Sequence, residues 1–109
     1  MTKDFKNVND FELFLNQNNV FDLLGIDNIG GFGSLARGEK SNDIDLLVEN
    51  VPDKNKLIEM KEDLEKKIGK KIDIVIDQYA NPIILHRAKK DLIYVKKYKK
   101  WSFIPSWNT

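Results

Sequence analysis

Apolar residues recur along this chain with two different periods, and the period predicts where helices and strands lie. In residues 54–68 an apolar side chain returns every three or four positions, at Leu57, Met60, Leu64 and Ile68, and Gly69 follows. This spacing predicts an amphipathic helix that ends before a glycine. In residues 43–49 and 71–77 apolar residues alternate with others, which predicts two strands with one face towards a core.

Residues 11–24 predict a first helix, because their apolar side chains fall on roughly one side of it. Asn9 or Asp10 is expected to cap the start of this helix and Gly25 to end it. The polar run at 17–19 is a point where the helix is expected to weaken or break.

The next segment is less regular. Residues 29–32 predict a poor strand, because Gly30 and Gly31 lie inside it. A short polar loop is expected to lead from Gly33 to Asn42.

The C-terminal half predicts two further elements. Pro82 is expected to open a helix that reaches about Lys90, and residues 92–95 are expected to form a last short strand. The order of helices and strands predicts an α/β (α+β) fold, in which a small mixed sheet is flanked by helices.

Length and composition narrow the class of protein. A chain of 109 residues supports one domain with a modest core. It has no cysteine, which excludes disulfides and thiolate metal sites. No apolar run is long enough for a signal peptide or a membrane span, so a cytoplasmic protein is expected.

The net charge of +1 is unevenly distributed along the chain. Residues 1–53 contain 4 basic and 10 acidic residues, whereas residues 54–109 contain 14 and 7. Such asymmetry suits a surface for an acidic partner or for phosphates. Two solvated faces that happen to differ in charge have the same pattern.

Three aspartates near the starts of the alternating segments are candidate metal ligands. Asp43 and Asp45 are two residues apart on one predicted strand and therefore share a face, and Asp73 starts the second strand. If the strands are neighbours, three carboxylates converge, as two-metal phosphoryl transfer requires, and Mg²⁺ prefers such oxygen ligands. Aspartates that merely decorate an exposed strand are the alternative. Asp77 shares the face of Asp73, which we prefer because it lies closer to the strand's start.

A glycine-serine turn precedes the aspartate pair. Glycine lets backbone N–H groups approach a phosphate closely, as at Gly33, and a helix N-terminus would add partial positive charge. Ser34 can donate to a phosphate oxygen, and Arg37 can bind phosphate with its forked guanidinium. A tight strand-to-helix turn without a ligand has the same pattern, so the position before the aspartate pair is what favours phosphate.

Three segments together resemble the minimal nucleotidyltransferase (MNT) family of the DNA polymerase β-like superfamily. They read GSLARGE from Gly33, DIDLLV from Asp43 and KIDIV from Lys71. The resemblance extends from about Ile29 to Val95. It implies a polymerase-β-like nucleotidyltransferase palm in residues 1–95, followed by a basic and aromatic tail in residues 96–109.

The resemblance also implies a role for each matching residue. Gly33 and Ser34 form the turn that binds the triphosphate of ATP, and Arg37 supports nucleotide binding. Asp43 and Asp45 bind Mg²⁺, with two ions expected. Asp73 is the third carboxylate of the metal site and orients or deprotonates the acceptor hydroxyl. The loop from Ser34 to Asp43 is two residues shorter than is usual in the family.

The family further implies a biological role. Small MNT proteins commonly act as antitoxins of HEPN-domain RNase toxins, and they transfer AMP from ATP to a toxin tyrosine. The chain is therefore expected to be an Mg²⁺-dependent protein adenylyltransferase with a HEPN-type toxin as its partner. One alternative is an antitoxin that acts by binding and occlusion with little catalysis. Another is a nucleotidyltransferase for a small molecule or RNA, although relatives of that kind generally carry a second substrate domain.

The C-terminal tail mixes lysines with aromatic residues, among them Tyr98, Trp101 and Trp107. Such a tail can bind single-stranded nucleic acid, anchor a protein interface or pack back onto the domain. We favour the last two, because the family already supplies a protein partner. His86, the only histidine, is expected to be structural or on the surface.

Overall fold

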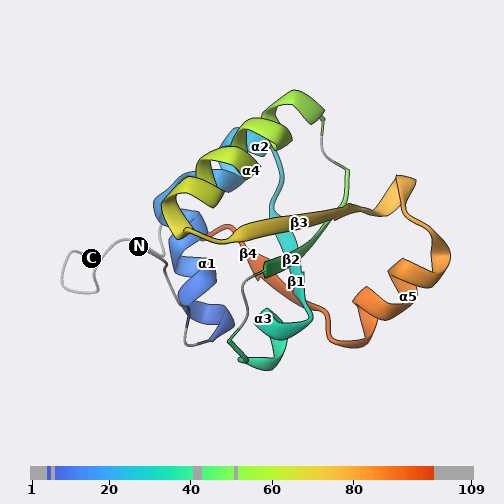
Figure 1. Cartoon of the computed structure of the whole chain (residues 1–109). Helices are drawn as coiled ribbons and strands as arrows, with labels where there is room; N and C mark the ends of the chain where they lie inside the picture. Colours follow the sequence, from blue (N-terminus) through green and yellow to red (C-terminus); the bar gives the residue numbers. More distant parts are fainter. Residues whose placement is uncertain (1–4, 6, 41–42, 51, 100–109) are drawn as a thin grey trace.

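The computed structural model describes residues 5, 7–40, 43–50 and 52–99, which form a four-stranded sheet with helices around it (Figure 1). The strands are β1 (Asn28–Phe32), β2 (Asp43–Val48), β3 (Lys71–Ile76) and β4 (Ile93–Lys96), and their order in the sheet is β3-β2-β1-β4. β1 runs antiparallel to β2 and β4, whereas β2 and β3 are parallel. The predicted mixed sheet is confirmed.

Three helices cover one face of this sheet: α1 (Val8–Gln17), α2 (Val20–Leu24) and α4 (Lys54–Ile68). They lie together in Figure 1, on the side of the sheet away from α5. Their buried apolar side chains form one core with Ile44, Leu46 and Val48 of β2 and Ile72 of β3. Asp43 and Asp45 lie on the other face of β2.

Helix α4 has the bounds that its apolar spacing predicts, and the four side chains of that row are buried. The Asp53 side chain caps its start by accepting from the backbone N–H of Asn55 at 2.9 Å. Gly69 follows its end with a φ of 76°, which favours glycine. Since parallel strands need a crossover, α4 is the element that carries the chain from β2 back to β3.

The start of α1 differs from the prediction. Asn7 is the N-cap and accepts from the N–H of Asp10 at 3.0 Å, so the assignment to Asn9 or Asp10 is wrong. The helix begins earlier because Phe5 and Val8 also pack against the core. The predicted break is confirmed: Asn18 ends α1, Asn19 has a left-handed φ of 56°, and Gly25 ends α2.

β1 is a full central strand in spite of its glycines. A Cβ on Gly30 would lie 2.4 Å from Leu92 Cδ1 and 3.4 Å from Leu47 Cβ. The neighbouring side chains therefore occupy the space above Gly30, and glycine leaves room there for the end of the Leu92 side chain. Leu92 packs there, and β4 begins one residue later than predicted.

Two short elements were not predicted. The expected polar loop after Gly33 begins with α3 (Ser34–Arg37), which ends at Gly38 with a φ of 70°. A 3₁₀ turn, η1 (Asp77–Tyr79), follows β3. Both are too short to show a helical period in the sequence.

Helix α5 (Pro82–Lys90) has its predicted bounds, and the side chain of Asn81 caps its start. It lies apart from the other helices in Figure 1. It buries Ala88 and leaves Ile83 and Ile84 exposed. His86 is exposed on this helix, as expected for a surface residue.

The first residues of the tail pack against α1. The N–H of Lys96 donates to Glu12 at 2.8 Å, and the N–H of Tyr98 donates to Asn16 Oδ1 at 2.8 Å. The rest of the tail, residues 100–109, lies outside the described residues, so its role stays a prediction. None of the described helices is both long and apolar enough to cross a membrane.

Candidate functional site

The pairing of β2 with β3 brings the predicted carboxylates together. Asp45 lies opposite Asp73, and Asp43 lies opposite Lys71. Because partners in a parallel pair point to the same face, the three aspartates and Lys71 share the face of the sheet that the core does not use. Phe32 of β1 pairs with Asp45 from the other side.

These side chains form an open group rather than a closed cage. Asp43 is exposed, Asp45 and Asp73 are partly exposed, and Lys71 Nζ is 3.5 Å from Asp73 Oδ1. Across the part of the chain that the structure describes, no three Asp, Glu or His side chains are arranged to hold one metal ion between them. Any ion here must take further ligands from elsewhere.

The Asp45 carboxyl has a shifted pKa. Burial raises its pKa above the usual value, and the negative charges of Asp73 and Asp43 raise it further, whereas Arg37 opposes the shift. The site is therefore a place where negative charge is crowded and partly removed from water. A bound cation would relieve both effects.

The glycine-serine turn lies directly against this group. Gly33 has a φ of 64° and a ψ of −137°, a conformation that favours glycine. A Cβ placed on Gly33 would be only 2.7 Å from Asp45 Oδ2. Glycine therefore allows both the turn and its close approach to the Asp45 carboxylate.

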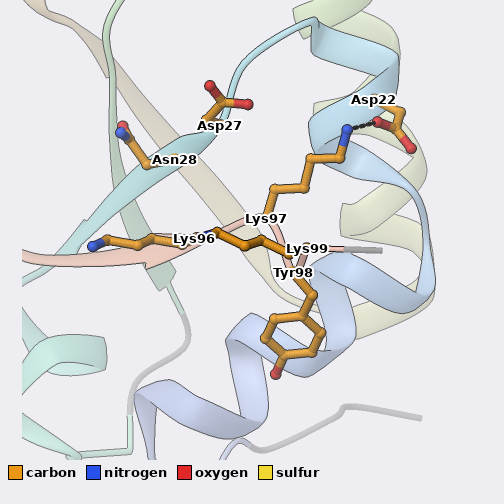
Figure 2. A pocket seen from close by; sticks show the side chains of 7 residues that line it. All are labelled: Asp22, Asp27, Asn28, Lys96, Lys97, Tyr98 and Lys99. Atoms are coloured by element: carbon orange, nitrogen blue, oxygen red, sulfur yellow. Dashed lines mark ion pairs between the residues drawn. The ribbon is translucent and has the colours of Figure 1, made fainter. Parts of the chain in front are cut away.

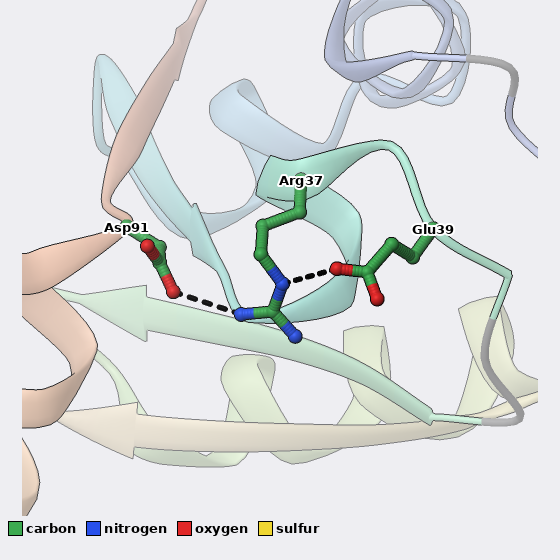
Figure 3. A network of polar contacts seen from close by, with 3 residues as sticks. All are labelled: Arg37, Glu39 and Asp91. Carbon is green, nitrogen blue, oxygen red and sulfur yellow. Dashed lines mark hydrogen bonds and ion pairs between the residues drawn. The ribbon is translucent and has the colours of Figure 1, made fainter.

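Ser34 and Arg37 are the first and last residues of α3, which follows this turn. They are three residues apart, so they share a side of the helix. Arg37 donates from Nη1 to Asp91 Oδ2 at 2.8 Å and from Nε to Glu39 Oε1, as Figure 3 shows. These bonds raise the pKa of the guanidinium above its usual value.

Asp77 lies away from the aspartate group. It follows β3, four residues beyond Asp73, and its charge acts on Tyr94. The Tyr94 hydroxyl donates to Glu49 Oε1 at 2.6 Å, a bond that raises the pKa of Tyr94 to about 12. The strand register therefore places Asp73, and not Asp77, beside Asp45.

A cavity among the described residues lies elsewhere, at the start of β1 and the end of β4. Its volume is about 790 Å³, and Figure 2 shows Lys97 paired with Asp22 at its edge. It is lined by Asp22, Asp27, Asn28, Lys96, Lys97, Tyr98 and Lys99. None of the candidate site residues lines it, and surface lysines of this kind define no specific ligand.

Sequence reasoning missed two residues that contact the candidate site. Lys71 faces Asp43 and Asp73, and it could have been found because it precedes Asp73 by two residues on the same strand. Asp91 binds Arg37 from 54 residues away. No local pattern marks it, since only the tertiary fold places it there.

Similarity to known proteins concerns the sequence family and the fold. The model of the family "Polymerase beta, Nucleotidyltransferase" matches residues 11–99. The protein adenylyltransferase MntA of Thermococcus cleftensis is 36% identical over 75 residues, which cover 65% of this chain and 76% of the relative.

Two solved structures have a similar fold. One is a toxin–antitoxin complex with AMP-PNP, with a TM-score of 0.58 and 22% identity over 79% of this chain and 77% of that chain. The other is a complex of a tri-AMPylated HEPN toxin with an MNT antitoxin from Shewanella oneidensis. Its TM-score is 0.54, with 21% identity over 78% of this chain and 72% of that chain. At these identities the likeness concerns the fold alone.

Proposed function

The chain belongs to the polymerase β nucleotidyltransferase family and is an enzyme of that class, and on this premise we propose that it transfers AMP from ATP to a tyrosine hydroxyl of a partner protein. The proposed partner is a HEPN-type toxin, which the transfer would neutralise. One observation carries the proposal: Asp45 lies opposite Asp73 and directly beneath the Gly33 turn. A nucleotide turn and an acceptor-side carboxylate thus meet at one point.

The relatives support the choice of acceptor and nucleotide. A relative with 36% identity is named a protein adenylyltransferase. Structures of similar fold include a complex with AMP-PNP and an AMPylated HEPN toxin bound to its antitoxin.

The residues of the site fit Mg²⁺. Asp43 and Asp45 offer hard oxygen ligands. The pKa of Asp45 is raised by burial and then by the negative charges of Asp73 and Asp43, and a bound cation would offset both effects. The open arrangement is suitable too, because Mg²⁺ usually combines one or two carboxylates with waters and substrate phosphates. Asp43 and Asp45, with Asp73, would hold two ions, and bound Mg²⁺ supplies charge neutralisation for the triphosphate.

Residues of the chain would bind the nucleotide and activate the acceptor hydroxyl. The Gly33 backbone and the Ser34 hydroxyl hold the β and γ phosphates, and Arg37 adds a forked cation. Asp73 orients the tyrosine hydroxyl and accepts its proton. The hydroxyl oxygen then bonds to the α-phosphorus, the bond from that phosphorus to the bridging oxygen breaks, and pyrophosphate leaves.

Intact-protein mass spectrometry tests the proposal. The purified chain is incubated with ATP, Mg²⁺ and the protein encoded by the neighbouring reading frame. We expect one or more AMP units on that partner, and none when Asp43→Ala and Asp45→Ala are combined. Transfer that survives in the folded double variant would overturn the mechanism. A stable complex without any added mass would instead favour inhibition by occlusion.

A matched pair of variants tests the role of Asp73. Asp73→Asn is expected to lower transfer by about a hundredfold or more, in the range of a lost general base. Asp77→Asn makes the same chemical change four residues further along the chain and should leave the rate within about twofold. The reverse result would move the acceptor-side role to Asp77.

A further inference from the structure

We propose that Asp91 is a positioning residue, which holds the Arg37 guanidinium ready for the triphosphate of the bound nucleotide. The inference rests on the proposed function, in which Arg37 contacts phosphate. It extends the site to the junction of α5 and β4, where Asp91 is the residue that follows α5. That junction is far along the chain from the segments of the nucleotide turn.

The contact itself is direct. Arg37 Nη1 donates to Asp91 Oδ2 at 2.8 Å, and Arg37 Nε donates to Glu39 (Figure 3). Glu39 is two residues from Arg37, just beyond the end of α3, whereas Asp91 follows α5. Asp91 is thus the contact that ties the guanidinium to the body of the protein.

Such a tie matters because Arg37 is long and its side chain is about half exposed. A free arginine samples many rotamers, and a ligand that binds it must first restrict them. Two carboxylates on Nε and Nη1 remove most of that freedom before the nucleotide arrives. Pre-organisation of this kind strengthens binding without adding a contact to the ligand.

The guanidinium is not saturated by these bonds. It has five N–H donors, of which the two hydrogen bonds use one on Nε and one on Nη1. Counting contacts with the described residues, both donors of Nη2 and one of Nη1 are left for a phosphate. Arg37 also stands one helical turn from Ser34, on the same side of α3, and its charge acts on Asp45. The Arg37 guanidinium is therefore close to where the phosphates are proposed to bind.

Calorimetric binding of AMP-PNP and of AMP to the full chain with Mg²⁺ tests this inference. Asp91→Asn is expected to raise the Kd for AMP-PNP by about two- to five-fold, the range of an exposed ion pair. The Kd for AMP should stay unchanged, because AMP lacks the β and γ phosphates. Asp91→Glu keeps the carboxylate and should restore most of the affinity for AMP-PNP.

A control and a double-variant cycle separate positioning from a structural effect. Asp22→Asn removes another exposed ion pair, with Lys97, away from the site, and should leave both Kd values unchanged. In an Arg37→Ala background Asp91→Asn should have no further effect on AMP-PNP binding. Additive effects, or equal losses for AMP and AMP-PNP, would show that Asp91 only supports the fold.

The remaining outcomes are also distinct. If Arg37→Ala leaves AMP-PNP binding unchanged, or the wild-type chain does not bind AMP-PNP, the proposed function fails at its nucleotide site. If Arg37→Ala weakens binding and Asp91→Asn does not, positioning by Asp91 is wrong while the proposed function stands. Tighter AMP-PNP binding by Asp91→Asn would show that Asp91 competes with phosphate, which would also overturn the inference.

Discussion

Gly33 is the residue on which the nucleotide turn depends most directly. A Cβ at this position would meet the Asp45 carboxylate at 2.7 Å, and the backbone has a φ of 64°. We expect Gly33→Ala to cost about 1–3 kcal/mol of unfolding free energy through backbone strain. It should lower AMP transfer by about ten- to a hundred-fold, because the turn and Asp45 can no longer both keep their places. Thermal unfolding and a transfer assay measure the two effects.

Gly25→Ala is the matched control for this prediction. Gly25 also has a positive φ, of 69°, but its added Cβ would meet only Pro52 Cγ at 3.6 Å. We expect about 1–2 kcal/mol of destabilisation from the left-handed conformation, with normal activity in the folded fraction. Equal losses of activity in both variants would mean that Gly33 has only a conformational role.

At the scale of residues, spacing along the chain predicts which side chains share a face of a strand, but not which residues of other elements lie beside them. The interval between Asp43 and Asp45 was enough to place both on one side of a strand, because the period of a strand is two. That Asp45 would lie opposite Asp73 depends on the pairing of two strands, which no local pattern contains. The contact of Arg37 with Asp91 could not be predicted from the sequence for the same reason.

At the scale of elements, α4 connects β2 to β3 and packs its apolar row on the core. Asp53→Ala removes the side chain that caps it and is expected to lower the free energy of unfolding by about 1 kcal/mol. The Kd for AMP-PNP should not change, because the cap is remote from the aspartates. Urea unfolding measures the loss.

Glu59→Ala is the control for the cap, since Glu59 is an exposed residue within the same helix. Alanine is the best helix former, so this variant should be nearly neutral. A loss as large as that of Asp53→Ala would show that the cap is not the cause.

Helices α4 and α5 were predicted with their bounds, α4 from its apolar spacing and the glycine after it, and α5 from Pro82 at its first position. The two alternating segments each end one residue earlier than predicted, and the first predicted helix is divided into α1 and α2. β1 looked poor because strand propensity penalises glycine and takes no account of Leu92 and Leu47, which occupy the space above Gly30. α3 has four residues, too few for a period.

At the scale of the whole molecule, the candidate site is expected to lower stability. The pKa of Asp45 is raised in the folded state. The stabilising contribution of the Asp45 carboxyl is therefore full at low pH and is lost as the pH rises through this raised pKa. We therefore expect Asp45→Asn to have a higher Tm than the wild type at pH 7. The difference should shrink as the pH falls towards 3.8, the ordinary value for aspartate.

Magnesium provides the second arm of this experiment. Addition of Mg²⁺ should raise the Tm of the wild type, because an ion bound only by the folded state stabilises it. Asp45→Asn should lose most of this rise and Asp77→Asn should keep it. A wild type that does not respond to Mg²⁺ would argue against the metal, and an Asp45→Asn variant that is less stable at pH 7 would argue against charge crowding.

The class of fold could be predicted from the order of elements, but the arrangement of the sheet could not. Alternation shows that residues 43–49 and 71–77 each have an inner face, without showing that they are parallel or adjacent. That follows from the crossover through α4, which packs its apolar row on the same core. The resemblance to a known family, rather than periodicity, supplied the expectation that Asp73 belongs to the same site as Asp43 and Asp45.

The position of β3 at one end of the sheet has a consequence for how the enzyme would fail on heating. β3 carries Asp73 and is bonded to the sheet through β2. A strand that is paired on one side only can detach in a local opening before the rest of the sheet unfolds. Inactivation would then precede melting, and the active fraction would decline while the bulk of the molecule still appeared native.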